Sequence, residues 1–220
     1  MRKIIIAHPR SGSTYLLSGF SDSLGEVFDL QRVHPDSFEL SEDLLHPDQT
    51  FPELWKTEWA QRYWDHLQKN ILSKESFTIK IFFEHIVHNP QIIEYFKSHD
   101  FYTYSICRKN EIDRIKSFLT ALSAGFHPKR ESTPHPQVIS YPQFLGAYYK
   151  CVLMPKLSHS LFKVDTILTY EELKAGVSVP HTDRPLRFNN NSSMDLFEKM
   201  ILNHQEVLHW LDLLQKQDSN

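Results

Sequence analysis

The first apolar segment of the chain is short and unbroken. Residues 3–7 include four successive apolar side chains, and the run stops at His8-Pro9. An apolar run of this length without alternation is typical of a strand that is buried on both faces of a parallel sheet. Small residues follow it, and the pattern then predicts a helix over 13–24.

The same succession of strand and helix recurs along the chain. Further strands are predicted over 77–83, 101–107 and 161–168. Helices are predicted over 50–71, from 89, over 110–125, over 141–157, from 169 and over 196–214. Thr-x-x-Glu capping boxes at 50–53 and 169–172 mark two of the helix starts. Strands that alternate with helices favour a three-layer α/β/α sandwich with a mainly parallel sheet and right-handed crossovers.

Length and local composition favour one domain with an insertion. The chain has 220 residues, and globular domains typically have about 100–200, so a single domain over 1–220 is expected. Residues 125–142 are rich in Pro, Ser and His and lack apolar periodicity. We interpret this stretch as a loop insertion that acts as a lid beside the substrate.

The charge balance excludes a nonspecific nucleic-acid-binding surface. The chain has 24 Lys and Arg against 27 Asp and Glu, a net charge of −3. No nucleic-acid partner is therefore expected, and any anion site must be local. Only Cys107 and Cys151 occur, too few for a disulfide scaffold. No apolar run reaches the length of a membrane span, so a reducing, cytoplasmic compartment is expected.

Histidine is abundant, which raises the question of a metal site. The chain has 13 histidines, and His85 and His88 could share one helix face. No Cys or carboxylate near these two completes a recognisable set of ligands. No metal is therefore expected.

The loop after the first strand carries the strongest chemical signal. A buried strand that passes through small residues into a helix presents backbone N–H groups to phosphate. The nucleotide-binding P-loop also needs a Lys before its Ser or Thr, but here Ser13 occupies the Lys position and Thr14 the hydroxyl position. The cation stands earlier in the loop, as Arg10. The sequence therefore predicts a 5′-phosphate site that does not suit ATP.

A second basic motif follows the strand predicted over 101–107. Arg108 and Lys109 end that strand, and Asn110 can cap the helix that follows. Ser117 lies seven residues after Asn110, so about 700° of rotation returns it to the same helix face about 10 Å along the axis. Arg108 and Ser117 could thus flank one anion.

The first loop resembles that of the sulfotransferases that use 3′-phosphoadenosine 5′-phosphosulfate (PAPS). In that family it commonly reads Pro-Lys/Arg-Ser-Gly-Ser/Thr-Thr, as Pro9-Arg10-Ser11-Gly12-Ser13-Thr14 does here. The resemblance implies a fold like that of the P-loop NTPases. It also implies that the residues from Arg10 to Thr14 hold the 5′-phosphate, with Arg10 neutralising charge on the oxygen that bridges phosphorus and sulfur.

The resemblance extends to the second basic motif. The family has an Arg at this strand end and a Ser in the next helix, usually eight residues apart, and they grip the 3′-phosphate. Here Lys109 stands eight residues and Arg108 nine residues before Ser117, so both cations remain candidates. Arg184 and Arg187, in the last polar stretch, would close over a phosphate of the nucleotide as C-terminal basic loops do in the family.

A sulfotransferase also needs a general base for the acceptor hydroxyl. Glu26 lies in a Gly-Glu-Val-Phe sequence that resembles the element placed beside the acceptor in bacterial and carbohydrate sulfotransferases. Other branches of the family use a residue after the second strand, where Glu84 and His85 stand here. Lys80, a charge inside the apolar run 77–83, would point into the site or emerge at a strand edge.

The sequence thus predicts a PAPS-dependent sulfotransferase that acts on a hydroxyl of a small-molecule, carbohydrate or lipid acceptor. One alternative is a P-loop kinase for a small metabolite, for which Asp165 could be the Mg²⁺ ligand although Lys163 interrupts its apolar run. Another is a noncatalytic nucleotide-binding protein of the same fold. The Tyr170-Glu171 element resembles one in the family that we interpret as structural.

Overall fold

The computed structural model of the chain describes residues 1–27, 65, 68–83, 87, 90–123, 136–186 and 196–218. Its strands form one five-stranded sheet in the order β2-β3-β1-β4-β5, and each neighbouring pair is parallel. The strands are β1 (Arg2–Ala7), β2 (Ser23–Val27), β3 (Phe77–Phe82), β4 (Tyr102–Cys107) and β5 (Thr166–Thr169). The short apolar run at the start of the sequence is thus the central strand.

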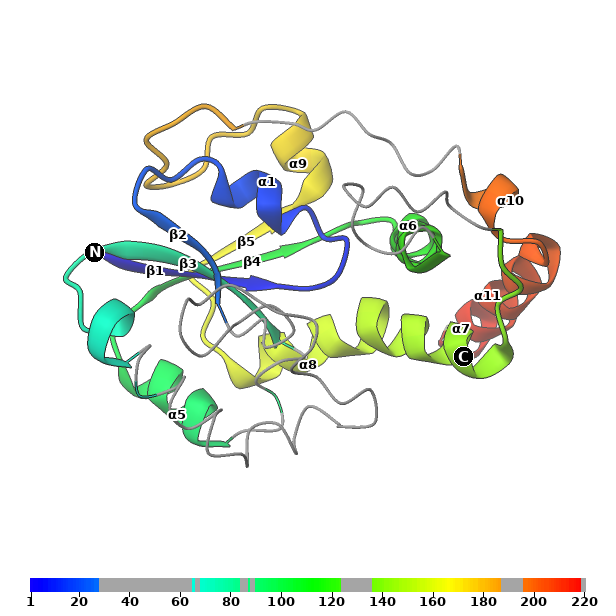
Figure 1. Ribbon diagram of the computed structural model, residues 1–220, viewed down its shortest axis with the longest axis horizontal. Helices are drawn as coiled ribbons and strands as arrows, with labels where there is room; N and C mark the ends of the chain where they lie inside the picture. The colour runs from blue at the N-terminus through cyan, green and yellow to red at the C-terminus, as the bar shows by residue number, and fades with distance from the viewer. Residues whose placement is uncertain are drawn as a thin grey trace.

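Helices cover both faces of this sheet. The structure describes α1 (Ser13–Leu17), α5 (Pro90–Ser98), α6 (Glu111–Ser123), α7 (Tyr141–Tyr148), α8 (Met154–Leu161), α9 (Tyr170–Lys174), α10 (Phe197–Met200) and α11 (His204–Asp218), with π-helical turns η3 (Gln68–Leu72) and η4 (Tyr149–Leu153). Figure 1 shows α1 and α9 above the sheet, α5 and α8 below it, and α6 beyond the carboxyl ends of the strands. The predicted three-layer α/β/α sandwich with a parallel sheet is therefore confirmed.

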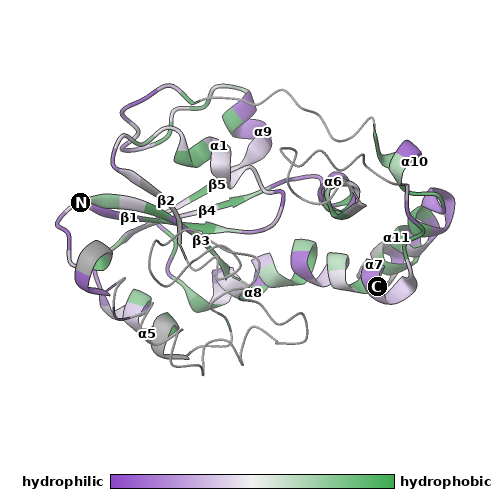
Figure 2. Cartoon of the chain, viewed as in Figure 1, coloured by the Kyte–Doolittle hydropathy of each residue, from purple (hydrophilic) through white to green (hydrophobic). Residues whose placement is uncertain are grey.

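The central strand is buried on both faces, as its sequence predicts. Ile4, Ile5 and Ile6 are at most 2% exposed. Ile5 packs in a cluster with Leu16 of α1 and Leu173 of α9, and Figure 2 shows apolar residues along the strands between the helical layers. Each fully buried aliphatic side chain contributes about 1.5–3 kcal/mol. This burial fixes β1, and so fixes the point from which the next loop leaves the sheet.

The predicted helix over 13–24 is too long, because the chain turns away from the helix axis after α1. This helix ends at Leu17, and β2 begins at Ser23. The carbonyl of Gly19 accepts the N–H groups of Asp183 at 3.0 Å and Arg184 at 3.2 Å. It therefore bonds to a distant segment and not to a following turn of α1.

The predicted boundary between the helix over 141–157 and the strand over 161–168 is also wrong. α7, η4 and α8 follow one another without a gap as far as Leu161, and β5 begins only at Thr166. The capping box predicted at 169–172 is confirmed, because Thr169 and Glu172 exchange both of its hydrogen bonds. The predicted helix over 50–71 lies outside the described residues except for 65 and 68–71.

The last residues of the predicted lid belong to a packed part of the molecule. Gln137 pairs with Ile201 in an isolated bridge, and Ile139 is 1% exposed in the cluster that joins α6, α7, α10 and α11. Ser140 and Gln143 form the capping box that begins α7. Residues 136–142 are thus anchored, whereas residues 124–135 lie outside the described residues.

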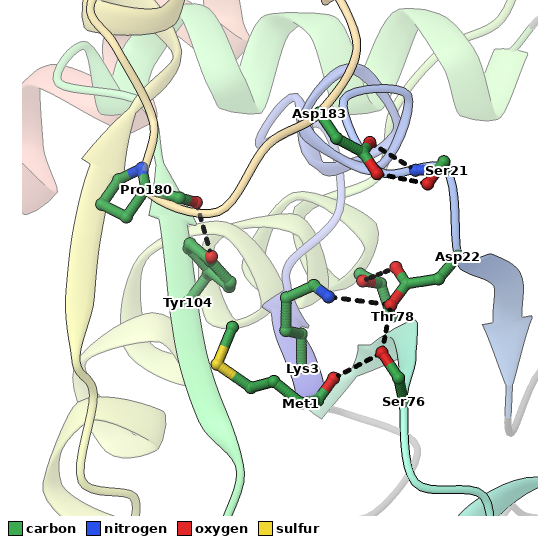
Figure 3. A network of polar contacts seen from close by, with 9 residues as sticks. All are labelled: Met1, Lys3, Ser21, Asp22, Ser76, Thr78, Tyr104, Pro180 and Asp183. Atoms are coloured by element: carbon green, nitrogen blue, oxygen red, sulfur yellow. Dashed lines mark hydrogen bonds and ion pairs between the residues drawn. The ribbon is translucent and has the colours of Figure 1, made fainter.

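A buried cation at the amino end of the sheet has a counter-charge. Lys3 of β1 is 6% exposed, and its Nζ lies 2.8 Å from Oδ2 of Asp22. Thr78 donates to the same carboxylate at 2.6 Å and Ser76 donates at 2.9 Å, while Figure 3 shows these side chains converging on Asp22. The charge of Lys3 is therefore balanced within the protein at this end.

Candidate functional site

The loop between β1 and α1 has an unusual backbone at the carboxyl end of the sheet. Arg10 has φ 59° and Gly12 has φ 91°, and the N–H of Ser11 donates to the carbonyl of His8 at 3.2 Å. A left-handed conformation is uncommon for a residue other than glycine and is often found at functional sites. Turns of this kind form concave surfaces of N–H groups that suit anions.

Gly12 is required in this loop for two reasons. Its φ lies in the region that glycine adopts readily, and a Cβ at this position would lie only 2.6 Å from Cδ2 of Tyr170. The loop therefore packs directly against the first residue of α9. Because α1 has only five residues, loop N–H groups and side chains must do most of any anion binding here.

Arg10 joins this loop to the second basic motif. Its Nε donates to Oγ of Ser117 in α6 at 3.0 Å, across 107 residues of sequence. Burial lowers the pKa of Arg10, and the charge of Arg108 lowers it further, against the opposing effects of Cys151 and Tyr170. Arg10 and Arg108 thus repel each other in the free protein, and an anion between them would relieve that repulsion.

Arg108 and Lys109, the two candidate cations of the second motif, point to different places. The Arg108 guanidinium lies 4.4 Å from the centre of the Tyr170 ring, and its buried Nε has no hydrogen-bond partner. Lys109 is directed toward α9, where its N–H donates to Glu171 at 3.1 Å and its Nζ lies 3.5 Å from Glu172. The structure therefore places Arg108 beside the loop and gives Lys109 carboxylate partners.

Ser11, Thr14 and Lys80 bring further polar groups to the loop. The Ser11 hydroxyl is fully buried and has no hydrogen-bond partner. Lys80 is 5% exposed, and its Nζ donates to Oγ1 of Thr14 at 3.3 Å. Ser13 is buried at the start of α1. Lys80 therefore reaches from β3 to the first loop and does not emerge at a strand edge.

For the other predicted site residues, no described contact links the side chain to the cluster around Arg10 and Ser117. Glu26 pairs through its backbone with Lys80 in the register of β2 and β3, but its side chain lies outside the description. Glu84, His85 and Arg187 lie outside the described residues.

Arg184 is exposed and lies at a separate opening. It lines a cavity of about 290 Å³ together with Thr14, Leu17, Ser18, Phe20 and Ser23. Thr14 is the one predicted site residue that this cavity shares with the loop. The predicted closure of Arg184 over a nucleotide phosphate stays a prediction.

Sequence reasoning overlooked two residues at this end of the sheet. Tyr170 was interpreted as structural, but its ring contacts both Gly12 and Arg108. Arg114 was not considered as a ligand-binding residue, although it stands three residues before Ser117 and so shares its helix face. That spacing was the signal that could have identified Arg114.

Comparison with protein families, with curated proteins and with solved structures gave no match. Within the described ranges, no group of three or more His, Cys, Asp or Glu side chains could hold a metal ion. The same ranges contain no helix with the length and apolar character needed to cross a bilayer. The arrangement at the carboxyl end of the sheet is that of a cationic site with open hydrogen-bond donors.

Proposed function

We propose that this chain is a PAPS-dependent sulfotransferase that transfers the sulfuryl group to a hydroxyl of a small-molecule, carbohydrate or lipid acceptor. One observation carries the proposal: the two motifs that resemble the family meet in space. The Arg10 Nε and Ser117 Oγ atoms lie 3.0 Å apart although 107 residues separate them in sequence. The donor nucleotide has anionic groups at its 5′ and 3′ positions, and this meeting point supplies cations for both.

The loop side of the site suits the 5′-phosphosulfate. Backbone N–H groups of the loop from 10 to 14, other than that of Ser11, and the Ser11 hydroxyl would bind the phosphate. Arg10 and Lys80 would face the charge that develops on the bridging oxygen. The α6 side suits the 3′-phosphate. Arg108, positioned by Tyr170, and Ser117 would hold it, while Lys109 interacts with the carboxylates of α9.

The chemical step is an in-line displacement at sulfur. The acceptor oxygen forms a bond to sulfur while the bond between sulfur and the bridging oxygen breaks, and the acceptor proton passes to a general base. Glu26 is our first candidate for that base, with Glu84 and His85 as the alternatives. Positioning and electrostatic stabilisation of the leaving bisphosphate supply most of the rate enhancement, by analogy with phosphoryl transfer.

The kinase alternative is disfavoured by the place of Asp165. This residue precedes β5, so it lies at the amino end of the sheet, away from the first loop. Its carboxylate accepts the N–H of Thr103 at 2.8 Å, and its own N–H donates to the carbonyl of Thr103 at 2.9 Å. Asp165 thus fixes the start of β5 and is not available as a Mg²⁺ ligand beside the loop.

The direct test is to compare nucleotides by thermal unfolding and then to measure transfer. Adenosine 3′,5′-bisphosphate should raise the Tm more than ATP or Mg-ATP does at equal concentration, because only the bisphosphate has anions at both positions. Labelled PAPS should then transfer its sulfuryl group to at least one member of a panel of hydroxylated acceptors. A preference for Mg-ATP would support the kinase, and bisphosphate binding without transfer to any acceptor would support the noncatalytic alternative.

A further inference from the structure

Arg114, in the first turns of α6, is the largest side chain that is fully buried in the described part of the chain. It is 1% exposed, and neither its Nε nor its Nη2 has a hydrogen-bond partner. A guanidinium keeps its charge in a protein. Burying a charge without a partner is unfavourable by several kcal/mol. Such a residue is expected where a ligand supplies the negative charge and the hydrogen-bond acceptors that the protein does not.

The position of Arg114 is the place where a ligand would bind in a sheet of this topology. Ser117 lies one turn further along α6 and accepts a hydrogen bond from Arg10. The charge of Arg114 acts on both His8, just after β1, and Cys107, at the end of β4. β1 and β4 are neighbours, and the chain leaves them toward opposite edges of the sheet. Ligands of open α/β sheets bind at such a point, beyond the carboxyl ends of the strands.

Two groups on which the charge of Arg114 acts, His8 and Cys107, are neutral. Burial first, then the charges of Arg114 and His159, hold the pKa of His8 well below its ordinary value, so its ring is uncharged at neutral pH. Its Nε2 lies 3.0 Å from Oγ of Ser158. Burial raises the pKa of Cys107 despite the opposing charge of Arg114, so its thiol is also uncharged. None of these groups can neutralise the guanidinium.

We propose that Arg114 is an anion-binding residue whose partner is an oxyanion (a phosphate, sulfate or carboxylate group) of a ligand bound beyond the ends of β1 and β4. Two sources have this chemistry: the donor nucleotide and an acidic group of the acceptor. The inference that Arg114 binds an anion rests on its burial and on its donors that have no partner. The choice between the two sources rests on the proposed function.

The first arm of the test uses inorganic sulfate as the probe. Thermal unfolding of the full chain is followed in sulfate and in chloride of equal ionic strength, for the wild type, Arg114→Met and Lys97→Met. Lys97 is an exposed cation of α5, 3.2 Å from Glu94, and its replacement controls for the loss of one positive charge. Because a charge-assisted hydrogen bond contributes about 1.5–3 kcal/mol, we expect Arg114→Met to weaken sulfate binding about ten- to hundredfold and Lys97→Met to leave it unchanged.

The Tm of the unliganded variants is a second readout, and it distinguishes ligand binding by Arg114 from a structural role. Replacing an unpartnered buried charge by an apolar side chain of similar length is neutral or stabilising, so the Tm of free Arg114→Met should equal or exceed that of Lys97→Met. A Tm several degrees lower, combined with unchanged sulfate affinity, would show that Arg114 is structural and would overturn the proposal. If Arg114→Met does not fold, Arg114→Lys replaces it, since Lys keeps the charge but not the planar set of donors; unchanged sulfate affinity in that variant would overturn the proposal as well.

The second arm repeats the sulfate titration with saturating adenosine 3′,5′-bisphosphate. A sulfate-dependent rise in Tm that persists and requires Arg114 assigns the anion to a separate, acidic acceptor. Loss of the sulfate effect, with weaker bisphosphate binding in Arg114→Met, assigns it to the nucleotide. Failure of the proposed function would look different: the bisphosphate would show no advantage over ATP, while the result of the first arm would still stand.

Discussion

The two ends of the sheet differ in whether their buried cations have a counter-charge within the protein. At the amino end, Lys3 is 2.8 Å from a carboxylate that also accepts two hydroxyl hydrogen bonds (Figure 3). At the carboxyl end, Arg108 and Arg114 have buried donors without partners, as does the Ser11 hydroxyl. Removing one partner of a buried ion pair destabilises the fold, whereas a buried cation that has no counter-charge in the free protein marks a place for a ligand. The contrast separates a charge that is paired within the fold from charges that we assign to ligand binding.

The largest expected effect is on turnover, at the carboxyl end. Arg10→Met should lower kcat/KM for sulfuryl transfer about 10²–10³-fold, the usual effect of removing one donor to a developing negative charge. The Kd for adenosine 3′,5′-bisphosphate should rise as well, because the same side chain binds the ground state. The free energy of unfolding should fall by at most about 1.5–3 kcal/mol, since the hydrogen bond from the charged Arg10 side chain to Ser117 is lost. Unchanged kinetics in Arg10→Met would remove this residue from the site.

The next effect tests the contrast between the ends directly, through the sign of the stability change. Lys3→Met should reduce the free energy of unfolding by about 2 kcal/mol, because it leaves the Asp22 carboxylate without its cation. Arg114→Met should not reduce it. Chemical denaturation of both variants measures the two values under the same conditions, and Lys3→Met combined with Asp22→Asn should recover part of the loss. Equal destabilisation by both single variants would show that the two ends do not differ in the way described.

Local patterns predicted the parts of the molecule that depend on neighbouring residues. The apolar run over 3–7 predicted the central strand, and the chemistry of 9–14 predicted a loop that proves to be tightly turned at Arg10 and Gly12. The end of α1 was missed because it depends on hydrogen bonds from 183 and 184 to Gly19. No local pattern can indicate a partner so far away in the sequence.

The missed site residues have the same physical origin. The contact of Tyr170 with Gly12 exists because α9 and α1 lie on the same face of the sheet. The spacing that left Arg108 and Lys109 as alternatives could not separate them, because the carboxylates that attract Lys109 come from α9. Burial of Arg114 likewise arises from tertiary packing, since α6 packs against α7, η4 and α10. The identity of these residues was in the sequence, but their environment came from tertiary structure.

The smallest effect is a difference in the pH range over which each end loses stability. The folded chain keeps His8 neutral, because its pKa lies well below the ordinary 6.5. The unfolded chain therefore binds more protons below pH 6.5, and the free energy of unfolding falls there by up to about 1.4 kcal/mol per pH unit for this group. At the amino end, burial raises the pKa of Asp22, but hydrogen bonds from Lys3, Thr78 and Ser76 outweigh it and bring the pKa below 3.8. Stabilisation by Asp22 is thus present above pH 3.8 and is lost only as the pH falls further.

Denaturation at a series of pH values in His8→Gln and Lys3→Met separates these two contributions. His8→Gln can still hydrogen-bond to Ser158 but does not titrate, so its stability should fall less steeply than that of the wild type between pH 6.5 and 5. Lys3→Met should keep the wild-type slope in that range and alter the loss below pH 3.8. Sulfate sharpens the comparison, because an anion beside Arg114 cancels part of the charge that lowers the pKa of His8. Followed by NMR, the titration of the His8 ring should then move to higher pH in the wild type and stay in place in Arg114→Met, whereas an unmoved titration in the wild type would place the bound sulfate away from Arg114.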